Sequence, residues 1–278
     1  MKAHLLILLI AANALLACNN KPKAADGDSV IATAAADTPM LAEAAAEPVT
    51  DSLQIPIYED PTLPLKLISQ SAYHGDEVPA NTTSLQWIGL FIGETGYYTA
   101  PAHLKTTRVE DVVLDENGEK TGIQISSDNP DSAFLFITKN EFISGGPVSA
   151  VHVGKAEDYG VAPGTSRKFE LKGNTYTIYA TADSSGEGAT LSYLNYKLYL
   201  NATINGNTTT QLLAASMHMD DQLMNVLFAG DIDGDGLMDF ILETSYHYNV
   251  MAPTLYLSKP AEAGKLLKLM GVNYSVGC

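Results

Sequence analysis

The stretch Tyr193-Leu-Asn-Tyr-Lys-Leu-Tyr-Leu200 decides the fold class of this chain. Polar and apolar side chains alternate along it, as expected for a strand with one face buried and the other in solvent. It leads through Asn205-Gly206, a strong signal for a tight hairpin turn, into residues 208–213, where threonines precede apolar residues. This arrangement predicts two long antiparallel strands in a half-buried sheet.

Working outward, the rest of the chain from about residue 53 shows the same mainly β pattern. Apolar or alternating runs lie at residues 85–92, 109–114, 122–126, 133–137, 169–171 and 176–179, with hairpin signals at Asn117-Gly118 and Gly173-Asn174. Helical patterning is weak, with short candidates only at residues 220–226 and 261–268. We predict a mainly β fold of antiparallel sheets, either sandwich-like or as two small β domains, with few short helices.

A break at residues 160–166, rich in Gly and Pro, is a candidate domain boundary. It predicts an N-terminal β-rich domain over residues 53–160 and a C-terminal one over residues 161–278.

The start of the chain predicts export and a lipid anchor. Residues 5–16 are apolar apart from Asn13, a length typical of a signal-peptide core and too short to span a bilayer. Leu15-Leu16-Ala17-Cys18 resembles a bacterial lipobox, which implies a signal peptide over residues 1–18 and acylation of Cys18. The alternative is an ordinary secretory signal that contains a cysteine. Residues 19–52 are rich in Ala, Asp, Glu, Thr and Pro, which predicts a disordered linker.

Charge and cysteine content limit the partners. The chain has 32 acidic and 16 basic residues, a formal net charge of −16, which argues against nucleic-acid binding. With Cys18 acylated, Cys278 stands alone, so a disulfide framework is not expected. Cys278 is then either a bystander or a site of intermolecular pairing. We expect a cell-envelope protein attached to the membrane through its lipid.

The run Asp231-Ile-Asp233-Gly-Asp235-Gly-Leu-Met-Asp239 carries the chemistry. Four carboxylates at alternate positions, with glycines that permit a tight backbone, suit oxygen ligation of a hard divalent cation. We predict a Ca²⁺ site with ligands from Asp231, Asp233, Asp235, Asp239 and the backbone carbonyl of Leu237. An EF-hand requires Glu at position twelve of the loop, but that position holds Leu242, and Glu243 comes one residue later.

With apolar runs at residues 226–230 and 240–242 on either side, the loop resembles the DxDxDGxxD loop of FG-GAP repeats in integrin-type β-propellers. That resemblance implies a Ca²⁺ loop between two strands. The chain holds a single copy, so a full propeller, which needs several blades, is not expected. Residues 231–261 and the C-terminal Gly277-Cys278 also resemble lipoproteins of Bacteroidetes-type bacteria, which implies an envelope location but no activity.

A second polar group flanks this loop and its strands. His218, Asp220 and Asp221 precede it and His247 follows it, so pairing of the strands could bring them to one rim as a transition-metal or hydrolytic site. The alternative is ordinary loop polarity. Trp87 and its aromatic neighbours Tyr97 and Tyr98 could offer a sugar platform but fit a core equally.

Two hypotheses for function follow from these features. The first is a non-enzymatic envelope lipoprotein with a structural Ca²⁺ site and a role in adhesion, assembly or binding of a glycan or protein. The alternative is a Ca²⁺-dependent cell-surface hydrolase that acts on glycan or peptide. The sequence lacks an HExxH motif, a GxSxG elbow, a P-loop and a CxxC pair.

Overall fold

The computed structural model describes residues 54–154, 160–186 and 191–277. All of them belong to one compact unit that extends from Ala44 to Cys278. The predicted signal peptide with Cys18, the predicted linker 19–52 and Cys278 lie outside the described residues.

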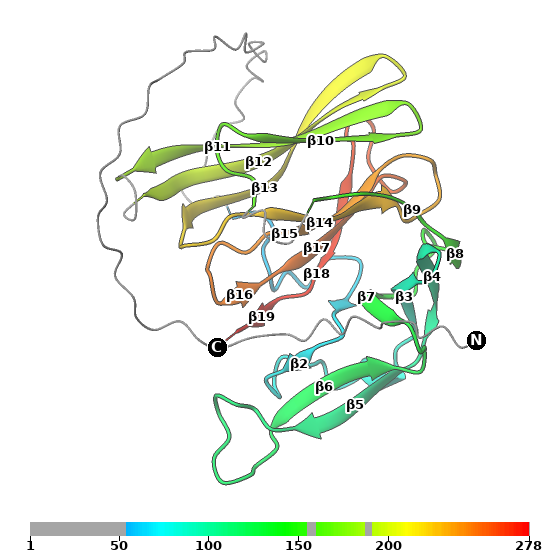
Figure 1. Ribbon diagram of the computed structural model, residues 1–278, viewed down its shortest axis with the longest axis vertical. Helices are drawn as coiled ribbons and strands as arrows, with labels where there is room; N and C mark the ends of the chain where they lie inside the picture. Colours follow the sequence, from blue (N-terminus) through cyan, green and yellow to red (C-terminus); the bar gives the residue numbers. More distant parts are fainter. Residues whose placement is uncertain (1–53, 155–159, 187–190, 278) are drawn as a thin grey trace, which may run out of the picture. The chain divides into compact units, whose positions relative to one another are not determined.

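The described residues form antiparallel sheets, which we name by a central strand (Figure 1). The β3 sheet has the order β1 (Leu67–Ile68), β7 (Ser132–Thr138), β3 (Trp87–Gly93), β4 (Gly96–Ala102) and β8 (Gly146–Pro147). The β6 sheet has the order β2 (Ala72–Tyr73), β6 (Gly122–Ser127) and β5 (Leu104–Val109). The β12 sheet has the order β10 (Ser166–Leu171), β11 (Asn174–Ser185), β12 (Ser192–Ile204) and β13 (Asn207–Met219). The β15 sheet has the order β18 (Lys268–Val272), β17 (Pro253–Leu257), β15 (Asp239–Glu243), β14 (Asn225–Asp231) and β9 (Ser149–Val151). A last pair joins β16 (Val250–Met251) to β19 (Ser275–Val276).

The β15 sheet is covered on both faces. Phe240 and Leu242 belong to the core that it shares with the β12 sheet, and Ile241 belongs to the core that it shares with the β3 sheet. Because both faces are covered, every residue of β15 is buried. This explains why its centre, residues 240–242, is a continuous apolar run rather than an alternating one.

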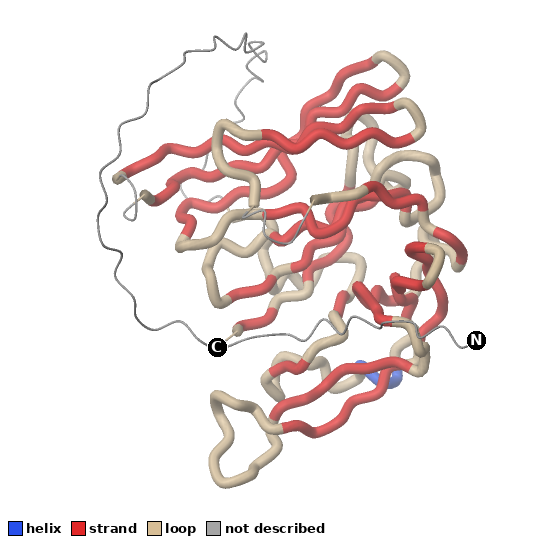
Figure 2. The backbone as a smooth tube through the Cα atoms, in the orientation of Figure 1, coloured by secondary structure: helices blue, strands red, loops and turns tan. Residues whose placement is uncertain are grey.

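A third core lies between the β3 and β6 sheets. Trp87, Phe91 and Phe136 pack there with Leu104 and Ile125. The cores therefore connect the sheets in the order β12, β15, β3 and β6 (Figures 1 and 2). The prediction of a mainly β, antiparallel fold is confirmed, and the described sheets close into neither a barrel nor a propeller.

The hairpin turns follow local residue chemistry. Asn205 and Gly206 have φ of 51° and 81° and connect Ile204 to its partner Asn207, which confirms the predicted turn. The turn predicted at Gly173-Asn174 lies one residue earlier in the chain. Lys172 and Gly173, with φ of 49° and 81°, occupy its centre.

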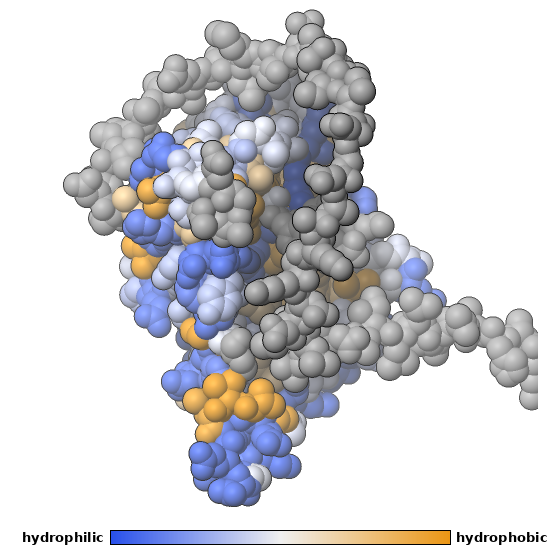
Figure 3. All heavy atoms as spheres, turned by 60° about the vertical axis from the view of Figure 1, so that its left-hand side comes forward, coloured by the Kyte–Doolittle hydropathy of each residue, from blue (hydrophilic) through white to orange (hydrophobic). Residues whose placement is uncertain are grey.

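The Asn117-Gly118 turn lies in a longer connection between its two strands than the sequence predicts. Both residues have positive φ, at 57° and 84°, but β5 ends at Val109 and β6 begins at Gly122, so the predicted strand 109–114 is wrong. Val112, Val113 and Leu114 lie exposed in this connection. Figure 3 shows apolar surface next to a hydrophilic tip at this end of the molecule.

The predicted helices at residues 220–226 and 261–268 are wrong. β14 begins inside the first segment, and the second holds turns that lead into β18. In the described part of the chain the only helical element is the 3₁₀ turn η1 (Thr82–Ser84).

Within the described ranges, no helical segment has the length and hydropathy needed to span a bilayer.

The predicted division at residue 160 stays a prediction. β9 precedes that position in the chain and β14 follows it, and these two strands pair through Ala229↔Val151 and its neighbours.

Candidate metal centre

The acidic loop joins β14 to β15, whose pairing places Gly230 opposite Asp239. Residues 232–238 form the connection. Gly234 and Gly236 have φ of 76° and 92°, a region that glycine enters without steric cost. The tight turn that these glycines permit returns the end of the loop to its beginning.

Three of the four carboxylates meet inside this turn. Asp231, Asp233 and Asp239 each offer an oxygen atom, and these atoms lie within 4.8 Å of one another. The exposed fractions of the three residues are 7%, 4% and 0%, whereas Asp235 is exposed. Three buried carboxylates at this separation could hold a metal ion.

Hydrogen bonds fix two of these carboxylates. Asp239 Oδ2 accepts the backbone N–H groups of Ile232 (2.6 Å) and Asp233 (3.0 Å), and its Oδ1 accepts that of Ser258 (2.7 Å). Asp233 Oδ2 accepts the N–H of Lys259 at 2.9 Å. The loop is thus attached to the residues that directly follow β17, the strand next to β15.

Asp231 differs from the other two because one of its oxygens lacks a partner. Its Oδ2 accepts Lys172 Nζ at 2.8 Å and the N–H of Gly236 at 3.1 Å. Its Oδ1 is buried and has no hydrogen-bond partner among the described residues. An unpaired buried carboxylate oxygen is costly, and a bound cation would remove that cost.

Burial also opposes the charges of the other carboxylates. Desolvation raises the pKa of Asp233 to about 6, and it raises the pKa of Asp239 well above its usual range. Asp231 in turn raises the pKa of the Lys172 ammonium, chiefly through their hydrogen bond. The four aspartates outnumber the two nearby lysines, Lys172 and Lys259, whose Nζ lies 3.4 Å from the Asp233 carbonyl, and the excess negative charge favours a divalent cation.

The sequence did not indicate three of the residues around this site. Lys172 comes from the β10–β11 turn, and Ser258 and Lys259 follow β17. The single hydroxyl hydrogen of Ser258 is shared between Asp239 Oδ1, 3.0 Å from Oγ, and Asp235 Oδ1, 3.1 Å from Oγ. No motif links these positions to the loop, since sheet pairing alone brings them there.

The second predicted group is brought together only in part. Asp220 pairs with His247, whose Nε2 lies 3.0 Å from Asp220 Oδ2; His247 is partly exposed and Asp220 is exposed. His218 is exposed beside a different cavity, with Tyr58 and Tyr246, and Asp221 lines another. This second site stays a prediction.

Of the aromatic residues that could offer a sugar platform, Trp87 lies in a core, whereas Tyr97 and Tyr98 are partly buried. Trp87 is 3% exposed, and its indole N–H donates to the carbonyl of Thr82 at 2.7 Å. Tyr98 packs against Phe91 with ring centroids 5.4 Å apart. Trp87 therefore serves the core between the β3 and β6 sheets.

Glu243 lies at the opposite end of β15 from the loop. Its Oε1 accepts the N–H groups of Ser245 (3.0 Å) and Ala252 (2.7 Å), and burial raises its pKa. Glu243 therefore fixes the connection between β15 and β17 and does not belong to the acidic cluster.

Glu243→Gln is expected to raise the free energy of unfolding near pH 7.5 by about 1 kcal/mol. Because the folded-state pKa is raised, stability is lost as pH rises from the unfolded value through the folded one. Glutamine removes the buried charge and keeps an oxygen that accepts both N–H groups. Urea denaturation at about pH 4 and about pH 7.5 measures this, with exposed Glu119→Gln as control. A gain that is equal at both pH values would contradict the explanation.

Comparison of this chain with protein-family models, curated proteins and solved structures gave no match.

Proposed function

We propose that the acidic loop binds Ca²⁺ and that the ion has a structural role. Asp231, Asp233 and Asp239 would hold it, with the carboxylate of Asp235 and the carbonyl of Leu237 as further ligands. The observation that carries this proposal is the buried, unpartnered Asp231 Oδ1 beside two other buried carboxylates.

The donor set favours Ca²⁺ over softer metals. The cluster offers carboxylate oxygens, which suit hard cations, and contains neither His nor Cys. Ca²⁺ accepts six to eight oxygen ligands in flexible geometry, and extracellular modules bind it with Kd of about 10⁻⁴–10⁻³ M.

The connections of the loop support a structural role. Lys172 of the β12 sheet contacts Asp231, and Lys259, whose N–H binds Asp233, also extends its Nζ to within 3.4 Å of the carbonyl of Phe142. The cavities of about 760, 610 and 480 Å³ are lined by other residues. A cation here would fix the β14–β15 loop where several segments meet.

We further propose that the protein is a non-enzymatic lipoprotein of the cell envelope with a role in adhesion, assembly or the binding of a glycan or protein. The apolar run at residues 5–16, the lipobox-like Cys18 and the acidic composition support this location. Mass spectrometry of the exported chain would show whether Cys18 carries the acyl chains.

Removal of Ca²⁺ is expected to lower the Tm by about 3–6 °C. At ten times Kd, ligand binding adds about 1.4 kcal/mol of stability, and 1 kcal/mol shifts Tm by roughly 2–4 °C in a domain of this size. Thermal unfolding in Ca²⁺ and in excess chelator measures the difference. Asp233→Ala should abolish the Ca²⁺ effect, whereas exposed Glu141→Ala should keep it. Identical melting curves of the wild-type chain in both conditions would overturn the proposal.

A further inference from the structure

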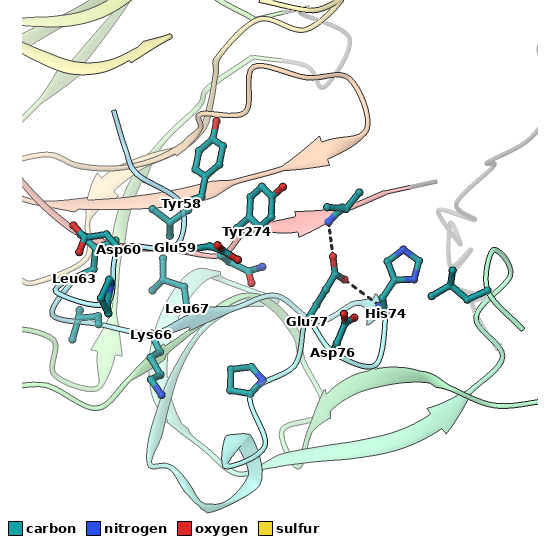
Figure 4. Close-up of a pocket in the computed structure, with 17 residues that line it drawn as sticks. Tyr58, Glu59, Asp60, Leu63, Lys66, Leu67, His74, Asp76, Glu77 and Tyr274 are labelled. Atoms are coloured by element: carbon teal, nitrogen blue, oxygen red, sulfur yellow. Dashed lines mark hydrogen bonds between the residues drawn. The ribbon is translucent and has the colours of Figure 1, made fainter. Parts of the chain in front are cut away.

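A cavity of about 760 Å³ lies between three segments that are distant in sequence. Tyr58 and Glu59 come from the segment before β1, His74 and Asp76 from the loop after β2, and Tyr274 from between β18 and β19. Figure 4 shows the two tyrosine rings on one side and the residues of the β2 loop on another. The volume falls in the range of small-molecule sites, roughly 300–1,000 Å³.

Hydrogen bonds between these segments hold the cavity open. Glu77 accepts the N–H of His74 at 3.1 Å and that of Val276 at 2.6 Å, as the dashed lines in Figure 4 show. Asn273 Nδ2 donates to Ser69 Oγ at 3.1 Å and to the hydroxyl of Tyr73 at 2.9 Å. The walls are thus fixed by the fold itself, so the cavity is preformed.

One wall is aromatic and the floor is apolar. The rings of Tyr58 and Tyr274 are stacked with centroids 5.1 Å apart and an interplanar angle of 18°. The Tyr58 hydroxyl donates to the carbonyl of Thr244 at 2.8 Å, which fixes that ring. Leu65 and Leu67 line the cavity and are 7% exposed each. This surface suits an alkyl chain, and a tyrosine ring also attracts a cation.

The polar lining carries an excess of negative charge. Glu59 and Asp76 are exposed and have neither a hydrogen bond nor an ion pair with any described residue. Asp60 is bonded to Thr62, and Lys66 extends away from the tyrosine rings in Figure 4.

The remaining basic group of the lining is already paired. His74 Nδ1 lies 2.5 Å from a carboxylate oxygen of Asp111, which offsets the charge of a protonated ring. The pKa of Tyr274 is raised by burial first, then by Tyr246, Glu59 and Glu77, so the carboxylates of Glu59 and Glu77 lie within electrostatic reach of that ring. Asp76 lies within such reach of His74. A concave surface with carboxylates of one sign attracts cations.

We propose that this cavity binds an alkyl ammonium or alkyl guanidinium group. The alkyl chain lies on Leu65, Leu67 and the tyrosine wall, and the cationic end is paired with Glu59 and Asp76. Such a group occurs in free diamines and in the lysine or arginine side chains of a protein partner. This site is separate from the acidic loop and does not depend on the proposed Ca²⁺ site.

Calorimetric titration of the full chain, saturated with Ca²⁺, tests this with three probes. These are 1,5-diaminopentane, Nα-acetyl-lysine methylamide and the uncharged 1,5-pentanediol. The two cations should bind saturably, and pentanediol should not. Tighter binding of the diamine identifies a free amine as the natural ligand type, and tighter binding of the lysine derivative identifies a side chain.

Two variants and one control locate the binding. Glu59→Gln/Asp76→Asn should weaken the affinity roughly tenfold, since two ion pairs are lost, and Tyr274→Leu should weaken it through the lost aromatic face. Glu94→Gln/Glu262→Gln removes the same charge from exposed positions elsewhere and should leave the affinity unchanged. Absence of saturable binding, equal binding of pentanediol, or equal weakening by the control variant would each overturn the proposal.

Discussion

Asp239→Ala is expected to lower the free energy of unfolding by about 3–5 kcal/mol in the Ca²⁺-free protein. The Asp239 side chain is fully buried, and its two oxygens accept the backbone N–H groups of Ile232, Asp233 and Ser258. Alanine leaves three buried donors without partners, each at about 1–3 kcal/mol. The substitution also removes a buried carboxylate whose charge is itself unfavourable there. The net loss of stability is therefore smaller than the sum of the three donor penalties. Urea denaturation in excess chelator measures this.

Asp235→Ala is the matched control in the same loop. Asp235 is exposed and accepts hydrogen bonds from the Leu237 N–H and Ser258 Oγ, so its loss should cost less than about 1 kcal/mol. Performing both measurements without Ca²⁺ separates the hydrogen-bonding role of Asp239 from any metal ligation. A cost below about 1 kcal/mol for Asp239→Ala would show that the loop is not held by these bonds.

Local patterns predicted the strands well where one face is buried. In β12, Tyr196, Leu198 and Leu200 are fully buried, and the residues between them are partly exposed, as the alternation of the sequence indicates. The Asn205-Gly206 turn was equally clear because its backbone requires positive φ at both residues. These features depend on interactions within a few residues of one another.

Long-range pairing was not accessible in the same way. Lys172 reaches Asp231 across 59 positions, and Val276 reaches Glu77 across 199. The four aspartates of the loop indicated a cation site, but their spacing did not show that Asp235 is exposed while the other three converge. The cavity beside Tyr58 and Tyr274 was missed for the same reason, because its walls come from opposite ends of the described chain.

The wrong helices have a related cause. Residues 220–226 contain a short apolar group that also fits a helix, but Val226 already pairs with Leu242 in the β15 sheet. Pairing with β15 gives that segment a buried position that an isolated helical turn would lack. Tertiary contacts therefore outweigh weak local propensity here.

Lys172→Gln is expected to increase the affinity of the acidic loop for Ca²⁺ by about tenfold. The Lys172 ammonium lies 2.8 Å from Asp231 Oδ2 and extends from a tight turn whose backbone is fixed by Lys172 and Gly173. The lysine therefore places one positive charge beside a proposed ligand of the ion. Two positive charges that share one carboxylate repel each other strongly, even with partial solvent screening. The side chain is 54% exposed, which limits the effect because the ammonium can turn toward solvent when the ion binds.

The same substitution should destabilise the protein when Ca²⁺ is absent, since Asp231 then loses its only cationic partner among the described residues. This opposite effect distinguishes a competing cation from a general gain in stability. Calorimetric Ca²⁺ titration and melting in chelator measure the two effects, and Lys168→Gln on the adjacent strand β10 controls for the change in net charge. Weaker Ca²⁺ binding by Lys172→Gln would mean that the lysine supports the site by orienting Asp231. Loss of stability without any Ca²⁺ binding in either chain would instead make Lys172 the permanent counterion of the loop.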